Sequence, residues 1–538
     1  MIFLLITAPP TLTCPDGFFH TKMAILIKEQ GIIQDFPWTQ FVSFSGQNFV
    51  DQHLGFHLLL IPFLYLPSPK NLDILSQELE PLLKTKLATL IFASLIFVLI
   101  YWLLRRFKIR GAIFYTFLPI FVSTFMARIS LIRAPVVSVI FLLLGIYLIL
   151  KERYFWLFIL SFFYVWLYGA WPLILLALII YCLANALKNI IEQPPELSDK
   201  IKNQNRKIQK YFYIFLFLVR HFFTKSNVKL LLACILGLTL GLVINPYFPK
   251  DIYFHFNELL KIAIINYHHK IGVGAEWYPP DPKDLFISIY PVLVPWLIAI
   301  AWFIISLRKQ NLASWTFSLL SAFFLIYTLK ARRNVEYFTP LAVLSIGLSL
   351  ESLWSTIDWS AYRTKIKELF QSQYQLPTFI LSLFRIFILI FFLGTILYLG
   401  PLRLHYVFKT GWSLFKFQDV SHWLKTNTQA NSIIYNVSWD IFPALFYFNT
   451  HNYYINGLDQ TFMYEHDPEL YKKWAKIFKG AVPLAELPLI IKNDFKSSYV
   501  LIDKHDKKTK AVDNLFQRSP AFKKVYEDEE AKVFQLIK

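Results

Sequence analysis

The chain has 538 residues, of which 56% are hydrophobic and 18% aromatic. Its mean hydropathy of +0.45 is far above that of soluble domains and excludes an ordinary globular protein. The formal net charge is +19, but the basic residues cluster in short stretches between apolar runs. That pattern is typical of cytoplasmic loops in a membrane protein and does not indicate a nucleic-acid partner.

The N-terminal region combines a short apolar start with a polar segment. MIFLLITAPP (1–10) is too short to span a bilayer, so we expect either a short, tilted first helix that ends near residue 13 or a start further upstream. A first outer loop follows over residues 14–83 and begins with CPDGFFHTKM. Within it, the apolar run 53–66 ends at PSP, which predicts a half-helix at the outer face.

Apolar runs long enough to cross a bilayer recur from there to residue 400. Placing the basic stretches on the cytoplasmic side fixes how the helices alternate; these stretches are 105–110, 151–154, 188–229, 308–309 and 361–369. The predicted spans are 84–104, 111–127, 134–150, 154–169, 171–187, 229–245, 286–306, 312–329, 339–353 and 378–400. With the first segment, the prediction is a polytopic α-helical membrane protein of about eleven spans.

Two segments outside the spans have a character of their own. The linker 188–229 is polar at first and then contains YFYIFLFLV, which we expect on the inner membrane surface. From residue 401, strand-like runs at 432–437, 498–503 and 531–537 alternate with a helix-like stretch at 467–480. The sequence therefore predicts a membrane core over 1–400 and a soluble α/β domain over 401–538, which is extracytoplasmic because it follows the last span on the same side as Asp16.

This topology collects arginines at the outer face, where the positive-inside bias disfavours them. They are Arg128 and Arg133 in MARISLIRAP, and Arg332 and Arg333 in KARRNVEYF. The planar guanidinium group suits phosphate because it donates two parallel hydrogen bonds. We therefore predict that these four arginines bind the phosphate or pyrophosphate of a lipid.

Acids at the same depth supply a complementary chemistry. Glycosyl transfer needs a carboxylate that activates the acceptor, directly or through a metal, and charge stabilisation of the departing phosphate. Asp16, Asp51 and Glu276 are the predicted catalytic acids. Beside them, His20, Lys22 and Trp277 are assigned to the acceptor or substrate.

Each feature also has a plain structural interpretation. Asp16 taken alone is an acid that flanks a helix, and His20, His53 and His57 are of a kind that is more often interfacial or buried than metal-binding. Arg332 and Arg333 become a cytoplasmic anchor if the topology is wrong by one span.

Together these residues resemble a known class. The acid in DGFF, the large first outer loop, the spans and the trailing domain resemble the GT-C membrane glycosyltransferases, and most of all the catalytic subunit of oligosaccharyltransferases. The resemblance implies that Asp16 and Glu276 hold a divalent metal, Mg²⁺ or Mn²⁺, and that Arg332 or Arg333 holds the lipid pyrophosphate. Trp439 and Asp440, in NVSWDIF, are similar to an acceptor-recognition motif of that subunit, WWDYG.

The sequence departs from that pattern in two places. WWDYG itself is absent, and RISLIRAP stands where a second acidic pair is expected. Asp35 or Asp51 is an alternative second acid, as in the protein mannosyltransferases and aminoarabinose transferases that the first loop also resembles. A branch without a metal cofactor therefore stays open.

We predict a glycosyltransferase of the plasma (inner) membrane. It takes a sugar or oligosaccharide from a polyprenyl phosphate or pyrophosphate and delivers it to a protein, lipid or glycan acceptor at the outer face. A transporter or flippase of an anionic lipid-linked sugar also needs arginines, but it is expected to bury charges near the bilayer midplane. A non-catalytic membrane scaffold is the other alternative.

Overall fold

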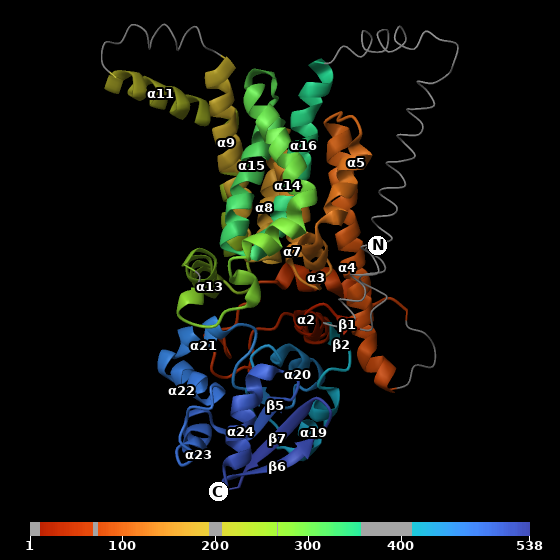
Figure 1. The fold of residues 1–538 in the computed structure, drawn as a ribbon, viewed down its shortest axis with the longest axis vertical. Coiled ribbons are helices and arrows are strands. Elements are labelled where there is room, and N and C mark those ends of the chain that lie inside the picture. Colours follow the sequence, from red (N-terminus) through yellow and green to blue (C-terminus); the bar gives the residue numbers. More distant parts are fainter. Residues whose placement is uncertain (1–10, 68–73, 193–206, 266, 357–410, 538) are drawn as a thin grey trace.

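The computed structural model describes residues 11–67, 74–192, 207–265, 267–356 and 411–537 (Figure 1). Residues 1–10 and the predicted span 378–400 lie outside the described residues. The described chain forms a helical bundle, a layer of short elements at one end of it, and a C-terminal domain beyond that layer (Figure 1).

Five helices of the described chain are long and apolar enough to cross a membrane. They are α4 (Ile74–Arg106), α9 (Pro172–Glu192), α12 (Lys225–Val243), α14 (Pro282–Ile305) and α15 (Leu312–Lys330). Each coincides with a predicted span, at 84–104, 171–187, 229–245, 286–306 and 312–329. The predicted spans 134–150, 154–169 and 339–353 fall on α7 (Pro135–Leu150), α8 (Tyr154–Leu167) and α16 (Val335–Thr356). The predicted total of about eleven spans is not confirmed.

The predicted span at 111–127 is not one continuous helix. This segment consists of α5 (Ala112–Phe117), the 3₁₀ turn η1 (Leu118–Phe121) and α6 (Ser123–Ile129), with an 87° bend between the first two elements and α6. Pro119 lacks an amide hydrogen, and Val122 has an extended backbone, so the helical hydrogen bonding is interrupted there. The bend makes this a broken span or a re-entrant segment, and it brings Arg128 to the end of the bundle.

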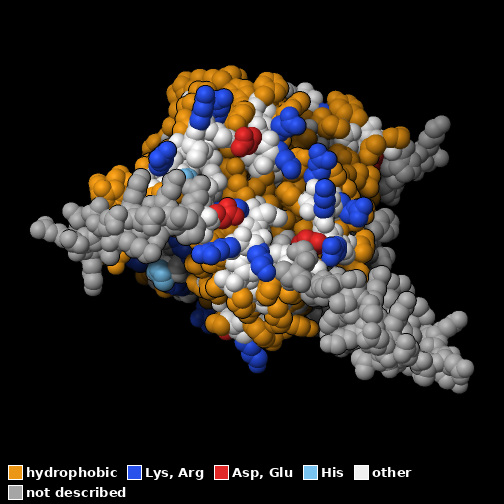
Figure 2. All heavy atoms as spheres, turned by 90° about the horizontal axis from the view of Figure 1, so that it is seen from above, with side chains coloured by type: hydrophobic (Ala, Val, Ile, Leu, Met, Phe, Trp, Pro, Cys, Tyr) orange, Lys and Arg blue, Asp and Glu red, His pale blue; other side chains and the backbone are white. Residues whose placement is uncertain are grey.

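The two ends of the bundle differ in charge. At the end far from the C-terminal domain, the turns after α4, α7 and α14 expose basic side chains: Arg105, Arg106, Lys108, Arg110, Lys151, Arg153, Arg308 and Lys309. We call this the basic end; Figure 2 looks onto it and shows many Lys and Arg side chains with few acids. The predicted cytoplasmic stretches 105–110, 151–154 and 308–309 therefore share one end. We call the opposite end the domain end.

The linker helix α11 (Lys207–Phe222) leaves the basic end sideways, across the direction of α9 (Figure 1). It is amphipathic and exposes large apolar side chains such as Tyr211, Phe212 and Phe215. This orientation agrees with the predicted position on the membrane surface.

The C-terminal domain contains a five-stranded sheet in the order β4-β3-β5-β7-β6. The strands are β3 (Ile433–Asn436), β4 (Tyr453–Tyr454), β5 (Ser497–Asp503), β6 (Phe522–Glu527) and β7 (Ala531–Leu536). β3 is parallel to β4 and β5, whereas β7 is antiparallel to β5 and β6. The three predicted strands and the predicted helix at 467–480 are confirmed as β3, β5, β7 and α22 (Pro468–Phe478). β4 and β6, the two edge strands, were not predicted.

The remaining helices of this domain surround the sheet (Figure 1). They are α19 (Gln418–Asn427), α20 (Phe442–Phe448), α21 (Gln460–His466), α23 (Leu487–Leu489), the π-helix η7 (Ile490–Asp494), the 3₁₀ turn η8 (Lys507–Thr509) and α24 (Lys510–Arg518).

The first outer loop joins the bundle to this domain. Its helices are α2 (Asp16–Gln30) and α3 (Leu54–Leu64), and α3 is the predicted half-helix at 53–66. α2 packs its aromatic side on α20: Phe18 meets Tyr447 at 5.7 Å between ring centroids, and Phe19 meets Phe446 at 6.0 Å. β1 (Thr11–Leu12) pairs with β2 (Trp412–Ser413), and the backbone around Thr39 bridges to Tyr454 at the sheet edge. These contacts hold α2 between the bundle and the domain.

The long loop after α12 completes the layer at the domain end. It contains α13 (Lys250–Asn257), the π-helix η2 (Glu258–Ile265) and the 3₁₀ turns η3 (Tyr267–His269) and η4 (Ala275–Trp277). A further 3₁₀ turn, η6 (Arg332–Asn334), links α15 to α16, and η5 (Leu307–Lys309) links α14 to α15 at the basic end.

Candidate active site

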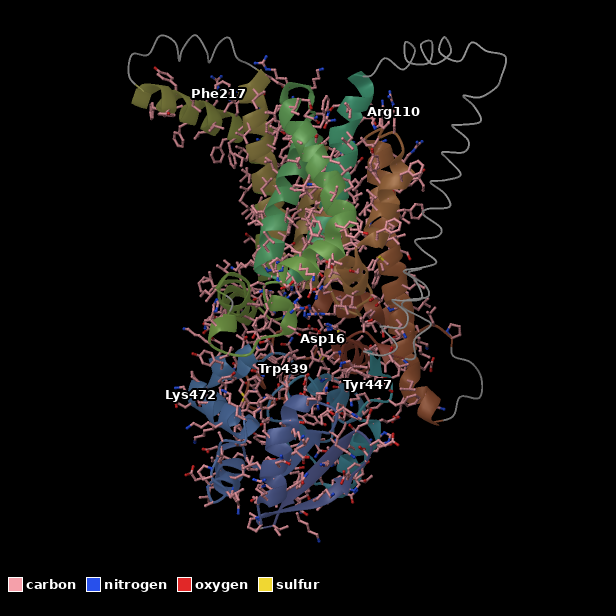
Figure 3. The ribbon with its side chains drawn as sticks, in the orientation of Figure 1. Asp16, Arg110, Phe217, Trp439, Tyr447 and Lys472 are labelled. Atoms are coloured by element: carbon pink, nitrogen blue, oxygen red, sulfur yellow. The ribbon has the colours of Figure 1, made fainter. Side chains whose placement is uncertain are left out.

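A cavity of about 1280 Å³ lies between the domain end of the bundle and the C-terminal domain. Its walls come from α2, the first outer loop, the segment 128–133 between α6 and α7, the turn between α8 and α9, the segments 258–259 and 269–278, η6 and the C-terminal domain. Figure 3 places Asp16 and Trp439 at this junction and Arg110 at the opposite end of the bundle. The cavity therefore collects predicted site residues that are up to 424 positions apart in the numbering of the chain, Asp16 and Asp440.

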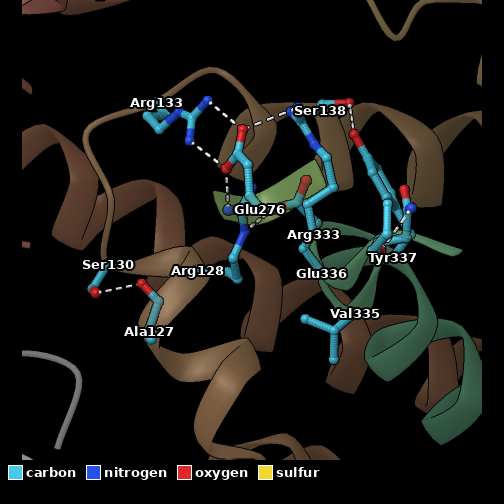
Figure 4. A network of polar contacts seen from close by, with 12 residues as sticks. Ala127, Arg128, Ser130, Arg133, Ser138, Glu276, Arg333, Val335, Glu336 and Tyr337 are labelled. Atoms are coloured by element: carbon cyan, nitrogen blue, oxygen red, sulfur yellow. Dashed lines mark hydrogen bonds and ion pairs between the residues drawn. The ribbon is translucent and has the colours of Figure 1, made fainter. Parts of the chain in front are cut away.

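Glu276 is the centre of a charged cluster in this cavity (Figure 4). Its Oε2 accepts hydrogen bonds from Arg128 Nη1 at 2.5 Å and from Arg133 Nη1 at 2.7 Å. Its Oε1 lies 3.1 Å from both Arg133 Nη2 and Arg333 Nη1. One carboxylate thus binds three guanidinium groups, and this geometry joins two of the predicted phosphate-binding regions in one site.

Two further acids complete the cluster. Arg128 Nε donates to Glu336 Oε2 at 2.9 Å, and Arg133 Nε lies 3.1 Å from Asp16 Oδ2. Three guanidinium groups therefore face three carboxylates, and the cluster is close to electrically neutral as it stands. Arg128 Nη2 is a buried donor with no hydrogen-bond partner.

Local backbone structure explains why these side chains meet. Arg128 is in the last turn of α6, after the 87° bend, and Arg133 is in the turn that precedes Pro135 at the start of α7. Glu276 is held on η4, whose flanking residue Gly274 donates its amide hydrogen to Asp459 of the C-terminal domain at 3.4 Å. The backbone amide of Arg332 in turn donates to Tyr278 O at 3.2 Å, which ties η4 to η6.

The cluster keeps its members charged. Burial alone raises the pKa of Glu276, but the charges of Arg133, Arg333 and Arg128 outweigh burial and hold this pKa well below its usual range. Burial alone lowers the pKa of Arg133, but the charges of Glu276 and Asp16 outweigh burial. The net result is a pKa well above the usual range of arginine. Glu276 is therefore an ionised carboxylate at any physiological pH.

The structure separates the two adjacent arginines of η6. The side chain of Arg333 is buried, approaches Glu276, donates to the Tyr168 hydroxyl and lies over the Trp277 ring at 4.1 Å. Arg332 is exposed and does not line the cavity. A 3₁₀ turn points consecutive side chains about 120° apart, so only one of the pair faces the site.

Two histidines of the first outer loop, His20 and His53, line the same cavity, and the buried His57 contacts His20. Asp51 Oδ2 lies 2.7 Å from His57 Nδ1, and His57 Nε2 lies 2.8 Å from His20 Nδ1. His53 stacks on Tyr168, with ring centroids 5.5 Å apart. Asp51, predicted as a catalytic acid, is thus near the cavity but is bound to a histidine.

The residues assigned to the acceptor divide into two groups. His20, Trp277, Trp439 and Asp440 line the cavity. Burial, with the nearby charge of Asp506, raises the pKa of Asp440 to about 6. Lys22 does not line the cavity; it lies half-buried, and the nearest charges that act on it belong to Glu29, Lys425 and Glu78. The structure therefore does not bring Lys22 into the site.

Several residues that line the cavity or support its walls had no role in the sequence prediction. Tyr168 binds Arg333, and His57 connects Asp51 to His20. Glu258 lines the cavity with a pKa raised by burial to about 7, and one of its carboxylate oxygens has no partner. His53 and His57 are four residues apart, as on one face of a helix, and this spacing is the only signal in the sequence for either histidine; Glu258 stands in an ordinary amphipathic stretch.

The donor set does not fit the divalent metal that the resemblance implies. Both proposed ligands are already neutralised, Asp16 by Arg133 and Glu276 by three arginines. Three guanidinium groups around the carboxylates repel a cation. Within the described ranges, no group of three or more His, Cys, Asp or Glu side chains is arranged to hold a metal ion.

No family model and no curated protein sequence matches the chain. Among solved structures, the fold is similar to the archaeal oligosaccharyltransferase AglB from Archaeoglobus fulgidus in complex with an inhibitory peptide and a dolichol-phosphate. It is equally similar to the A. fulgidus oligosaccharyltransferase tethered through a disulfide bond to an acceptor peptide with the NVT sequon. Each match has a TM-score of 0.58 and 12% identity, and covers 92% of this chain and 66% of the solved chain.

This similarity confirms the fold that the sequence resemblance implied, that of an oligosaccharyltransferase-like GT-C protein. At 12% identity it shows the fold alone. The chain spans about two thirds of the length of these two solved chains.

Proposed function

We infer that the chain is a membrane glycosyltransferase that takes a sugar from a polyprenyl phosphate or pyrophosphate and transfers it to an acceptor inside the cavity. The arginine cluster around Glu276 is the observation that carries this proposal. It lies at the end of apolar helices, where the phosphate of a membrane lipid can reach it, and opens into a cavity large enough for a sugar and part of an acceptor. The fold shared with oligosaccharyltransferases supports the reaction class.

The basic end supports the orientation that the proposal requires. Exposed Lys and Arg side chains gather at the end far from the cavity, as on the cytoplasmic face of membrane proteins (Figure 2). The cavity and the C-terminal domain are then on the extracytoplasmic side. The donor lipid enters from the outer leaflet, and its phosphate meets the arginines at the depth where the helices end.

In this reaction, the bond between the anomeric carbon and the phosphate oxygen breaks, and its electron pair leaves with the phosphate. A nucleophilic atom of the acceptor forms the new bond to that carbon and loses its proton. Guanidinium groups lower the barrier because they stabilise the charge that develops on the departing phosphate. Arg133 and Arg333 line the cavity and supply these donors.

The neutral cluster implies an exchange of partners when the donor binds. Glu276 occupies the hydrogen-bond donors that a phosphate needs, so the phosphate must replace it on at least one arginine. We expect Arg333 to change partner, because it makes one contact to Glu276 whereas Arg133 makes two. Glu276 then holds the other arginines in place during the reaction.

We further propose that transfer needs no metal ion. The charge that a divalent cation would supply beside Asp16 is supplied here by Arg133, at 3.1 Å from the carboxylate. This assigns the chain to the branch without a metal cofactor that the sequence left open.

The adjacent arginines of η6 provide the test. Purified protein is titrated with dolichyl phosphate in detergent, and the rise in its thermal unfolding midpoint gives the affinity. Arg333→Ala is expected to weaken binding by about 10- to 100-fold, since it removes charge-assisted hydrogen bonds worth about 1.5–3 kcal/mol. Arg332→Ala is the matched control and is expected to bind like the wild type.

Arg333→Lys separates charge from geometry. It keeps the positive charge but loses the fork, so we expect an intermediate affinity. Equal affinities for the wild type and Arg333→Ala would reject the donor site. A second assay measures transfer of label from a radiolabelled polyprenyl-linked sugar pool in membranes. An enzyme transfers the label, whereas a flippase moves the lipid without breaking the sugar–phosphate bond. A scaffold does neither.

A further inference from the structure

Three buried side chains of the first outer loop form a line of hydrogen bonds that ends in the cavity. Asp51 Oδ2 is 2.7 Å from His57 Nδ1, and His57 Nε2 is 2.8 Å from His20 Nδ1. Their exposed fractions are 5% for Asp51, 0% for His57 and 3% for His20, so water does not compete for these bonds. The backbone amide of His53 donates to the other carboxylate oxygen of Asp51 at 3.0 Å and fixes its orientation.

The hydrogen-bond inventory assigns every proton in this line when both rings are neutral. The Asp51 carboxylate only accepts, so His57 Nδ1 carries a hydrogen and His57 Nε2 has a lone pair. His20 Nδ1 must then donate to that lone pair. His20 Nε2 is therefore left without a hydrogen, as a proton acceptor.

This acceptor nitrogen belongs to a residue of the cavity wall. His20 and Asp16 both line the cavity and are four residues apart on α2, which places them on one face of the helix about 6 Å apart along its axis. Asp16 contacts Arg133 of the proposed phosphate site. His20 is thus one helical turn away from the place where the donor phosphate is proposed to bind.

Several charged or titratable groups face this imidazole. Burial lowers the pKa of His20 well below its usual range, and His53, His57 and Arg133 lower it further. From α2 itself Asp16 is the nearest acid, and the first outer loop contributes Asp51 through His57. His20 is therefore unprotonated, and able to accept a proton, across the physiological pH range.

The geometry points to His20 as the general base of the transfer reaction, with His57 and Asp51 as positioning residues and a hydroxyl group as the acceptor. This inference rests on the proposed function. As the acceptor oxygen bonds to the anomeric carbon, its O–H bond breaks and the proton joins His20 Nε2. The Nδ1 proton of His20 can pass to His57 Nε2, and that of His57 Nδ1 to Asp51, so the charge is shared along the line. The electron pair of the broken sugar–phosphate bond leaves with the phosphate.

The hydroxyl class follows from the number of hydrogen-bond acceptors that the site offers to the incoming group. A lone imidazole nitrogen accepts one proton from one direction, which matches a sugar or side-chain hydroxyl with its single O–H. A carboxamide presents two N–H groups, and the nearby carboxylates of Asp16 and Glu276 are already bound to arginines. An imidazole base also suits this reaction, because the O–H becomes acidic only once the oxygen has attacked the oxocarbenium-like carbon.

The test uses full-length protein in membranes and the radiolabelled polyprenyl-linked sugar pool. His20→Ala and His20→Gln are expected to lower the transfer rate by about 10²- to 10⁴-fold, the usual contribution of a general base, with unchanged affinity for dolichyl phosphate. His57→Gln and Asp51→Asn are expected to lower it less. His505→Gln, an exposed histidine of the C-terminal domain that does not line the cavity, is the control and should transfer like the wild type.

Two readouts separate a base from a structural residue. Added imidazole is expected to restore part of the rate to His20→Ala, because it can occupy the space that the ring leaves. The fall in wild-type rate at acid pH, where His20 becomes protonated, is expected to disappear in His20→Gln. Transfer by both His20 variants at the wild-type rate would overturn the inference. A second result would also overturn it: His20→Ala is inactive and is not rescued by imidazole, and the transfer rate of His20→Gln still falls at acid pH.

The acceptor class is tested separately on the labelled product. Mass spectrometry is expected to find the sugar on oxygen, and a sugar on an amide nitrogen would overturn the assignment. Failure of the proposed function is distinguishable from failure of this inference. In the first case the wild type itself neither transfers label nor binds dolichyl phosphate; in the second the wild type does both and the His20 variants transfer equally well.

Discussion

Glu276→Gln is the perturbation with the sharpest expected result, because it should move stability and donor affinity in opposite directions. The carboxylate binds three arginines through four contacts of 2.5–3.1 Å and is largely buried. Removing one member of a buried ion pair costs about 3–5 kcal/mol. The cost should be smaller here, about 2–3 kcal/mol, because Arg128 retains Glu336, Arg133 retains Asp16 and the amide oxygen still accepts hydrogen bonds.

Donor affinity should increase at the same time. The glutamine no longer competes as an anion for the arginines, and the cluster gains one positive charge. A gain of about 0.7–1.4 kcal/mol is reasonable for one charge in a partly open site, which corresponds to a 3- to 10-fold lower Kd for dolichyl phosphate. The stabilisation of the variant by this ligand should therefore exceed that of the wild type, although its midpoint without ligand is lower.

The assay is thermal unfolding in detergent, with and without dolichyl phosphate. Glu486→Gln, an exposed glutamate of the C-terminal domain, is the control for a lost carboxylate and should leave both midpoints unchanged. The pH dependence of the unfolding midpoint gives an internal check on the role of the Glu276 charge. The pKa of Glu276 is lower in the folded state, so its stabilisation is present above the unfolded pKa and is lost as pH falls toward the folded value. The difference between wild type and variant should shrink in acid. A variant that binds dolichyl phosphate more weakly would refute the exchange of partners.

Three further predictions concern the rest of the site and its support. Asp16→Asn should lower transfer of label, because it removes one of the two carboxylates that hold Arg133 in place. EDTA should leave wild-type transfer unchanged; loss of transfer in EDTA would restore the metal-dependent branch. Burial raises the pKa of Asp440 to about 6, so the ionised carboxylate destabilises the folded state once the pH exceeds that value. Asp440→Asn should therefore raise the unfolding midpoint at pH 8 and change it little at pH 4. Phe446→Ala removes a fully buried ring between α20 and α2 and should cost about 3–5 kcal/mol, seen as a lower midpoint; an unchanged midpoint would show that α2 is held elsewhere.

The sequence predicts the arrangement of the bundle because hydropathy and charge act along the chain. RRFKIR, KERY and RK mark turns, and the structure places all three at the basic end. It cannot predict the bend near Pro119, because the bent segment is as apolar as a straight helix. β6 was not predicted because its two consecutive lysines are both exposed, as lysines of edge strands often are, and interrupt the apolar alternation. β4 was not predicted because it has only two residues.

The candidate site is predictable only in part, because the sequence pattern gives the end of the bundle on which a residue lies but not the partners it meets there. The predicted topology puts Asp16, Arg133 and Glu276 at the same end of the bundle, and in the structure Arg133 contacts both acids. Their partners depend on packing between distant segments: Arg128 and Glu336 are 208 residues apart. Whether Arg332 or Arg333 faces the cavity depends on the rotation of a 3₁₀ turn that no residue pattern specifies.

The arginine cluster and the histidine line depend on each other electrostatically. Burial is the main cause that lowers the pKa of His20, and the charge of Arg133 lowers it further, so the imidazole is an unprotonated but weak base while the site is empty. A bound donor phosphate places negative charge beside Arg133, and that charge raises the pKa of His20. The base would then be strongest when the donor is in place. This predicts a higher apparent pKa for the acid fall of kcat, which reports the enzyme with substrate bound, than for that of kcat/KM, which reports the free enzyme. Identical values in the two profiles would mean that the phosphate binds too far from Arg133 to act on His20.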